Sequence, residues 1–156
     1  VSVPKQILQT KDLKIICSFL RGYFDTDGCF AFSKKIRNSC KFQREYNYYP
    51  RILITTCSKQ LAEEVIHLVF ALGFCCRCYV YNSKIETENI KYQLQIAGKE
   101  ALMKWIQLIK PKNSAKLSRY LIWKKFGFCP PNTTYNQRIN ILEGKINPYS
   151  FCGPIA

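Results

Sequence analysis

Ten residues near the N-terminus, Phe19-Leu20-Arg21-Gly22-Tyr23-Phe24-Asp25-Thr26-Asp27-Gly28, carry most of the information about the fold. They end a predicted helix that Thr10 or Asp12 can cap and that stops at the glycine. Asp25 and Asp27 then stand at a helix C-terminus, where the negative end of the dipole disfavours carboxylates. A divalent cation would remove that penalty, and oxygen ligands suit Mg²⁺. The alternative is an Asp-x-Asp-Gly turn that caps local backbone groups, and the residues alone leave both interpretations open.

The same helix is apolar on nearly every side, because only Lys14, Ser18 and Arg21 interrupt it before the acidic end. A helix on the surface of a single domain normally has one apolar stripe, so we expect this one to be covered on two sides. Its small residues Ser18, Gly22 and Thr26 recur every four positions. Such a line would let a second helix approach closely.

Periodic patterns predict the remaining elements. The order α-β-β-α-β-β-α-α predicts an α+β fold, with one four-stranded, mainly antiparallel sheet and helices on one face. We expect a core domain over residues 1–126 and a C-terminal extension over 127–156 that packs on the core and contains a short helix capped by Thr133 or Thr134. The predicted strands cover 29–37, 51–56, 74–82 and 90–97, and the predicted helices cover 59–72, 100–109 and 115–126.

Alternation along the strands separates a core face from a polar face. Residues expected in the core include Ile52, Ile54, Ile90, Leu94 and Ile96. The opposite face has five basic and no acidic residues, whereas a face that is polar only for solubility normally mixes both signs. Its side chains suit phosphates and base edges. The expected nucleic-acid face comprises Ser33, Lys35, Arg37, Arg51, Thr55, Arg77, Tyr79, Tyr81, Lys91, Gln93 and Gln95.

The charge of the chain supports that expectation. The 156 residues include 24 Lys and Arg and 10 Asp and Glu, for a net charge of +14. Residues 29–60 and 98–156 carry most of the excess. A basic surface rich in aromatic residues favours nucleic acid over a merely soluble basic protein.

The nine cysteines and one histidine do not predict a metal site. No Cys-x-x-Cys pair occurs, and His67 has no partner at ligand spacing. His67 is expected on the exposed side of its helix. The cysteines, including the cluster Cys75-Cys76-Arg77-Cys78, are better explained as free buried thiols. A zinc site, a redox function and an intracellular disulfide stay open as weaker alternatives.

The apolar segments are too short for a membrane helix and the N-terminal residues do not form a signal peptide. We therefore expect a soluble intracellular protein, from the cytoplasm of a prokaryote or an organelle, without a membrane or small-molecule partner.

The motif resembles the signature of the LAGLIDADG homing endonucleases, which Leu20, Gly22, Asp25, Asp27 and Gly28 match outright. The departures are Arg21 in place of the usual alanine, a bulkier Tyr23, a conservative Phe24 and a small Thr26.

Downstream segments extend the resemblance to the α-β-β-α-β-β-α core of this family, over about residues 10–126. Residues 54–62 resemble the strand-to-helix junction of inteins and archaeal members. Residues 105–120 resemble the following loop and helix, and 123–133 resemble tails of free-standing archaeal proteins. The cytoplasm of an archaeon is therefore one expected location.

The resemblance implies a homing endonuclease that makes double-strand breaks in a long DNA target, as proteins that spread mobile introns or inteins do. One motif in a chain of this length implies a homodimer on a near-palindromic site. The expected dimer interface comprises Ser18, Gly22, Asp25 and Thr26.

The resemblance also implies roles for single residues. Asp27 matches the catalytic, metal-binding aspartate, for Mg²⁺ with Mn²⁺ as a substitute. Asp25 and the carbonyl of Thr26 are further candidate ligands, although Asp25 is expected mainly in capping. Lys112 aligns with a basic residue near the active site, and Ser58 with a polar one, although Ser58 can equally cap a helix. Alternatives to these roles are Lys110 or Lys116 in place of Lys112, and contact of Arg21 with phosphate.

Two other functions stay open. A non-cleaving relative on the same scaffold would be a transcription regulator or an intron RNA maturase, and the two intact motif acids argue against it. A cysteine-rich metal or redox protein is the alternative from another class.

Overall fold

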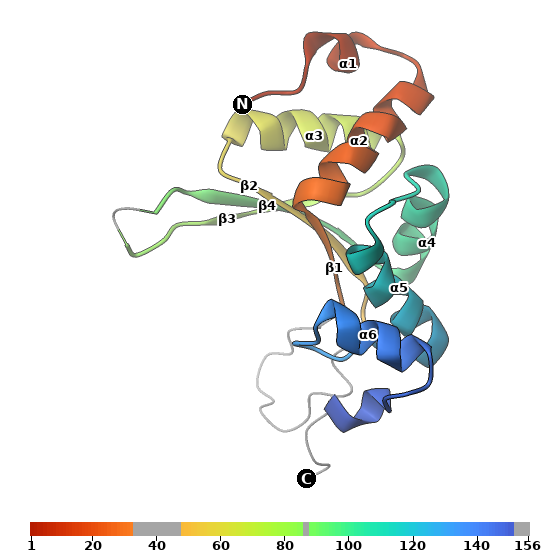
Figure 1. Cartoon of the computed structure of the whole chain (residues 1–156). Coiled ribbons are helices and arrows are strands. Elements are labelled where there is room, and N and C mark those ends of the chain that lie inside the picture. Colours follow the sequence, from red (N-terminus) through yellow and green to blue (C-terminus); the bar gives the residue numbers. More distant parts are fainter. Residues whose placement is uncertain (33–47, 86–87, 152–156) are drawn as a thin grey trace. The chain divides into compact units, whose positions relative to one another are not determined.

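The computed structural model describes residues 1–32, 48–85 and 88–151 (Figure 1). It consists of two compact units, each assembled from segments distant in the sequence. The first unit combines Val1–Cys29 with Arg51–Lys112, and the second combines Phe30–Pro50 with Asn113–Ala156. This division of the chain differs from the expected boundary between residues 126 and 127. The expected core domain and C-terminal extension stay a prediction.

Four helices belong to the first unit: α1 (Lys5–Gln9), α2 (Leu13–Asp27), α3 (Lys59–Ala71) and α4 (Lys99–Leu108). The predicted start of α2 is confirmed, because the Asp12 carboxylate accepts a hydrogen bond from the Lys14 amide. Ser58 caps α3 in the same way through the amide of Leu61. The short helix α1 has no side-chain cap, and its pattern is too short to predict from sequence.

The predicted α+β fold with a four-stranded antiparallel sheet is confirmed. The strands β1 (Gly28–Ala31), β2 (Arg51–Thr56), β3 (Arg77–Tyr81) and β4 (Lys91–Ala97) form a sheet in the order β1-β2-β4-β3. The central strand β4 pairs antiparallel with both β2 and β3.

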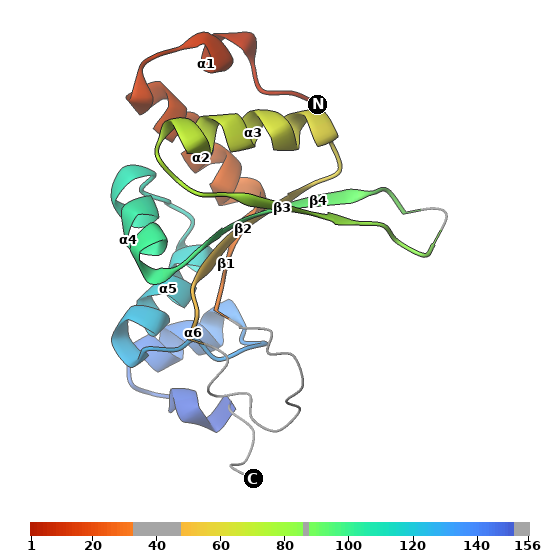
Figure 2. The same ribbon diagram turned by 180° about the vertical axis from the view of Figure 1, so that it is seen from behind.

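Within the first unit, α2 and α3 lie on the same side of the strands β2 and β4 (Figures 1 and 2). The side chains of Ile52, Ile54, Leu94 and Ile96 point to that side, and each is at most 3% exposed. Their alternation along the strands predicted this face correctly.

Three expectations about the strands need correction. The strand predicted over 29–37 ends at Ala31 in β1, and residues 33–47 lie outside the described part of the chain. The strand predicted from Phe74 begins at Arg77. Ile90, expected in the core, precedes β4 and is 46% exposed. The reason is that the hairpin of β3 and β4 extends past the helices, so all of β3 is exposed (Figure 1).

The helix α2 is covered on one side within a single chain. Its buried residues are Ile16, Cys17, Leu20 and Phe24. The opposite side, with Ile15 at 43% exposure, is open. Among the described residues, the cover on a second side that the sequence predicts for α2 is therefore not found.

The second unit contains α5 (Ser114–Phe126), α6 (Tyr135–Leu142) and a 3₁₀ helix over Pro148–Phe151. Its core is aromatic, with Phe32 stacked on Trp123 at a centroid distance of 5.7 Å. The predicted C-terminal helix is confirmed as α6, which begins with a capping box between Thr134 and Gln137.

Gly28, the last residue of the motif, is required by packing. A Cβ atom added there would overlap the ring of Phe24, which is fully buried. Gly28→Ala is therefore expected to lower the free energy of unfolding by about 1–3 kcal/mol, as overpacking of a core does. Chemical denaturation measures the change, with Gly22→Ala as the control, because an added Cβ at Gly22 meets no described atom within 4 Å apart from its chain neighbours and the backbone of its own helix. Equal stability of the wild type and the Gly28→Ala variant would contradict this account.

Candidate metal site and nucleic-acid interface

The end of α2 places two carboxylates where the helix dipole disfavours them. No basic residue occupies the last turn of α2 to offset Asp25 and Asp27. Asp27 is exposed, and within the described part of the chain its carboxylate has no hydrogen bond or ion pair. It thus keeps its oxygens available for a ligand from outside the chain.

Asp25 is occupied within its own chain. Its two carboxylate oxygens accept hydrogen bonds from the backbone N–H of Lys112, at 3.1 and 3.0 Å. This contact joins residues 87 positions apart and brings the loop after α4 to the end of α2. The expected capping function of Asp25 agrees with this geometry, but the partner is a distant amide and not a local one.

Arg21 also contacts this loop. Its Nε donates a hydrogen bond of 2.6 Å to the carbonyl oxygen of Ile109, the C-cap residue of α4. The suggestion that Arg21 contacts phosphate stays a prediction, because this hydrogen bond uses only the Nε of its guanidinium group. Between the two anchored residues, Lys110 adopts a left-handed backbone with φ of 52° and Pro111 is buried.

The residues at the end of α2 fit Mg²⁺ in the manner usual for enzymes that act on phosphates. The described residues contain no group of three or more His, Cys, Asp or Glu side chains able to hold a metal. Mg²⁺ commonly takes only one or two carboxylates and completes its shell with water and phosphate oxygens. A single available carboxylate at Asp27 suits that pattern better than it suits zinc, which takes three or four protein ligands. The hydroxyl of Thr26 donates to the carbonyl of Tyr23 at 2.9 Å. The predicted ligand role of the Thr26 carbonyl stays a prediction.

Ser58 and His67 have ordinary structural environments. The Ser58 hydroxyl accepts from the Leu61 amide and donates to the carbonyl of Val1 at 2.7 Å. The first contact is a helix cap and the second holds the N-terminal residue, so the catalytic role of Ser58 stays a prediction without support from its contacts. His67 is exposed on α3, as expected.

The strand register gathers the predicted polar residues on one face of the sheet. In antiparallel pairing, directly opposed residues point to the same side. Thr55, Gln93 and Tyr79 form one cross-strand row, and Gln95 stands opposite Arg77 in the next. Eight of the eleven expected residues share this face, which we call the polar sheet face: Arg51, Thr55, Arg77, Tyr79, Tyr81, Lys91, Gln93 and Gln95. The other three, Ser33, Lys35 and Arg37, lie outside the described residues.

The polar sheet face is accessible and carries only positive charge among its eight residues. Tyr79 and Tyr81 are 38% and 48% exposed. Leu53 also lies on this face, opposite Gln95, and was missed because an apolar residue on a polar face breaks the alternation. Such a surface can hold phosphates through its basic residues and contact bases through Gln and Tyr.

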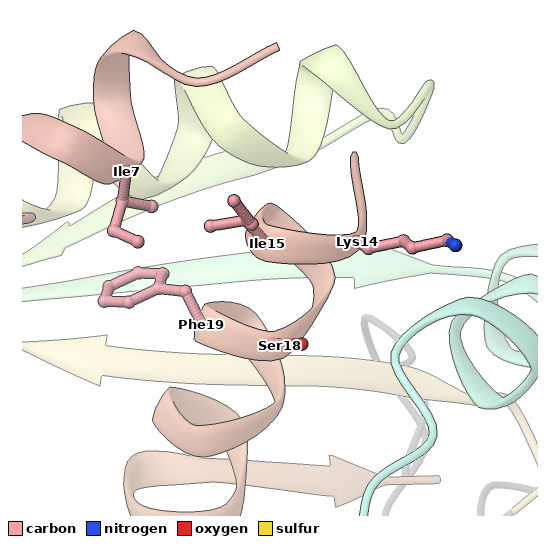
Figure 3. Close-up of a pocket in the computed structure, with 5 residues that line it drawn as sticks. All are labelled: Ile7, Lys14, Ile15, Ser18 and Phe19. Atoms are coloured by element: carbon pink, nitrogen blue, oxygen red, sulfur yellow. The ribbon is translucent and has the colours of Figure 1, made fainter. Parts of the chain in front are cut away.

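The open side of α2 combines small and apolar residues. Ser18, Gly22 and Thr26 follow one another at four-residue spacing opposite the buried stripe. Beside them, a shallow pocket is lined by Ile7 of α1 and by Ile15 and Phe19 of α2, whose side chains gather together while Lys14 points away (Figure 3).

The cysteines are free thiols where the structure describes them. Cys17 and Cys129 are buried, as expected, but Cys57, Cys75 and Cys78 are exposed. The expectation of buried thiols is therefore wrong for these three, because Cys57 and Cys75 lie in the connections on either side of α3 and Cys78 lies on the exposed strand β3. Cys40 and Cys152 lie outside the described residues.

Burial raises the pKa of the Cys76 thiol to about 11. Only the thiolate is a strong nucleophile, and below pH 11 this thiol is mainly neutral. Alkylation of Cys76 by iodoacetamide is therefore expected to be slow at pH 8 and to accelerate with each pH unit up to about 11. Peptide mass spectrometry after timed labelling measures it, with the exposed Cys57 as the control. Rapid labelling of Cys76 at pH 8 would revive the redox alternative.

No helix among the described residues has the length and apolarity that crossing a membrane would require.

Comparison with known proteins finds similarity over the part of the chain that contains the candidate metal site and the polar sheet face. The model of the family described as "LAGLIDADG-like domain" matches residues 14–110, which include α2, the sheet and α4. The replicative DNA helicase DnaB of Rhodothermus marinus is 29% identical over 94 residues, which are 60% of this chain. The match spans 9% of the length of the helicase.

Proposed function

The chain belongs to the LAGLIDADG-like family, and from that membership we propose that it is a homing endonuclease that makes double-strand breaks in DNA. The family supports a homing endonuclease or a related nucleic-acid-binding protein. The observation that favours cleavage is the available carboxylate of Asp27, next to an Asp25 that is already engaged by Lys112.

The chemistry proposed is metal-assisted hydrolysis of a phosphodiester bond. Asp27 would hold Mg²⁺, for which Mn²⁺ can substitute, together with water and a DNA phosphate. When bound, Mg²⁺ lowers the pKa of an attacking water and stabilises charge on the attacking and leaving oxygens. The ammonium group of Lys112 would stabilise the charge that develops on the phosphate. The polar sheet face would hold the duplex.

The protein is proposed to act as a homodimer. The open side of α2 has the features of a helix interface: a line of small residues flanked by the apolar Ile15 and Phe19. The intrahelical hydrogen bond of Thr26 satisfies its hydroxyl, so close packing there would not bury an unpaired polar group. Asp25, also expected in the interface, accepts hydrogen bonds from the amide of Lys112 in its own chain, and its place in the interface stays a prediction.

Substitutions at Gly22 test the dimer. Because Gly22 is open in a single chain, Gly22→Ala should raise the free energy of unfolding of the monomer by about 0.5–1 kcal/mol. Gly22→Glu would place two like charges at a dyad and is expected to give a folded monomer. Sedimentation velocity measures the mass, with circular dichroism as the check on folding. A dimer that persists in Gly22→Glu would rule out this interface.

The function is tested by selection from a randomised duplex library, with bound and cut molecules separated, in Mg²⁺ and in Ca²⁺. We expect cleavage of a near-palindromic site in Mg²⁺ and binding without cleavage in Ca²⁺. Specific binding with no cleavage in either ion would contradict the nuclease and favour the non-cleaving alternative. Preference for structured intron RNA over duplex DNA would then indicate a maturase, and preference for DNA a transcription regulator.

The similarity to the helicase does not extend this proposal to unwinding of DNA. A match that spans 9% of the helicase suits a LAGLIDADG element inserted in that protein, as an intein would be. Inteins and mobile introns are the two settings proposed for this chain.

A further inference from the structure

A pair of residues one helical turn apart on α2 holds the loop that carries Lys112. Arg21 and Asp25 are separated by four positions, so they lie on the same side of the helix. Arg21 donates to the carbonyl of Ile109, where the loop begins, and Asp25 accepts from the amide of Lys112, where it ends. The loop of residues 109–112 is therefore fixed at both ends to the helix that carries Asp27.

The contact of Arg21 with Ile109 brings a positive charge to the C-terminus of α4. A cation is favoured at the C-terminus of a helix, where backbone carbonyls lack partners. α4 has no basic residue in its last turn. Arg21, half-buried against the loop, supplies from another helix the charge that α4 lacks.

The backbone between the two anchors needs such restraint. Lys110 has φ of 52°, a conformation that costs energy for any residue with a Cβ and persists only where the surroundings enforce it. Pro111, which follows, is buried and further limits the chain. Loss of one anchor would let Lys110 relax and would move Lys112 away from the end of α2.

We propose that Arg21 is a positioning residue, which acts through the Ile109–Lys112 loop to place Lys112 beside the Asp27 end of α2. This proposal rests on the proposed nuclease function. The anchor depends on arginine at position 21, because its long side chain brings the Nε to the carbonyl of Ile109. The geometry also favours Lys112 over Lys110 as the functional lysine, because Lys112 is bonded at its own amide to a motif acid.

A double-mutant cycle tests the proposal on the DNA site found by selection. Arg21→Ala, Lys112→Met and the double variant are compared with the wild type by single-turnover cleavage in Mg²⁺ and by binding in Ca²⁺. We expect Arg21→Ala to lower the cleavage rate roughly 10–100-fold, as loss of a supporting contact does, with the dissociation constant unchanged within about twofold. The double variant should cleave no more slowly than Lys112→Met alone, and Arg21→Lys should recover part of the rate.

The controls separate positioning from general destabilisation. Lys11→Ala removes an exposed positive charge near the start of α2 and should cleave as the wild type does. Unchanged cleavage by Arg21→Ala, or additive losses in the double variant, would overturn the proposal, as would a loss explained by weaker binding.

A measurement that needs no cleavage keeps the inference separate from the nuclease itself. Hydrogen exchange at the Lys112 amide should accelerate at least roughly tenfold in Arg21→Ala, while amides in the centre of α3 stay protected. If the wild type cleaves no DNA, the proposed function fails while this result still reports on the anchor. Unchanged exchange at Lys112 would show that Arg21 does not hold the loop.

Discussion

Replacing Asp27 with asparagine is expected to lower the rate of single-turnover cleavage roughly a thousandfold, or about 4 kcal/mol of transition-state stabilisation. Asp27 is exposed at the end of α2, and its carboxylate has no partner among the described residues. The substitution removes the negative charge that would hold Mg²⁺ and changes almost nothing in shape. Folding and the polar sheet face should therefore be unaffected.

Cleavage in Mg²⁺ and DNA binding in Ca²⁺ separate the two effects of Asp27→Asn. The dissociation constant should stay within a few-fold of the wild-type value. Asp12→Asn is the matched control, because it makes the same change at the other end of α2, where asparagine caps as well as aspartate. Retention of wild-type cleavage by Asp27→Asn would remove this residue from the active site.

Replacing Arg138 with methionine is expected to lower the free energy of unfolding by about 3–5 kcal/mol. Arg138 lies on α6 and is 5% exposed. Its Nε donates to the Ser118 hydroxyl at 2.7 Å and its Nη2 to the carbonyl of Ala115 at 3.2 Å. Its Nη1 donates to the carbonyl of Thr133. Methionine fills part of the space but leaves these acceptors without a charged donor.

Urea denaturation followed by circular dichroism measures this loss, at one protein concentration because dimerisation would add to the apparent stability. The matched control is Lys145→Ala, which removes an exposed cation from a surface ion pair with Glu143. That change should stay within about 0.5 kcal/mol of the wild type. A loss below about 1 kcal/mol for Arg138→Met would show that the second unit does not depend on this residue.

The local elements of this protein were readable from its sequence, because each depends on residues close together in the chain. The cap of α3 at Ser58 and the inward side chains of β2 follow from helix capping and from the two-residue period of a strand. The polar sheet face was predictable for the same reason, and its eight described residues share one side. The two carboxylates at the end of α2 could also be recognised from the sequence, because acidic side chains are unfavourable at the C-terminus of a helix unless a positive group or a hydrogen-bond donor compensates them.

Solvent exposure at the tip of the sheet was not readable in this way. Ile90 continues the alternation of β4 and was expected in the core, but it is 46% exposed. The pattern assigns a side chain to one face of a strand, and whether a helix covers that face depends on lengths and packing elsewhere in the chain.

The sequence by itself determined the order of elements from α2 onward, the family and the two motif acids, all of which depend on side-chain identity at short spacing. Only the tertiary structure assigned Asp25 to the amide of Lys112 and Arg21 to the carbonyl of Ile109. Almost every residue offers the same backbone N–H and C=O groups, so no side-chain pattern marks which distant one a charged group will meet. The division between an available Asp27 and an engaged Asp25 is decided by the path of the loop at residues 109–112.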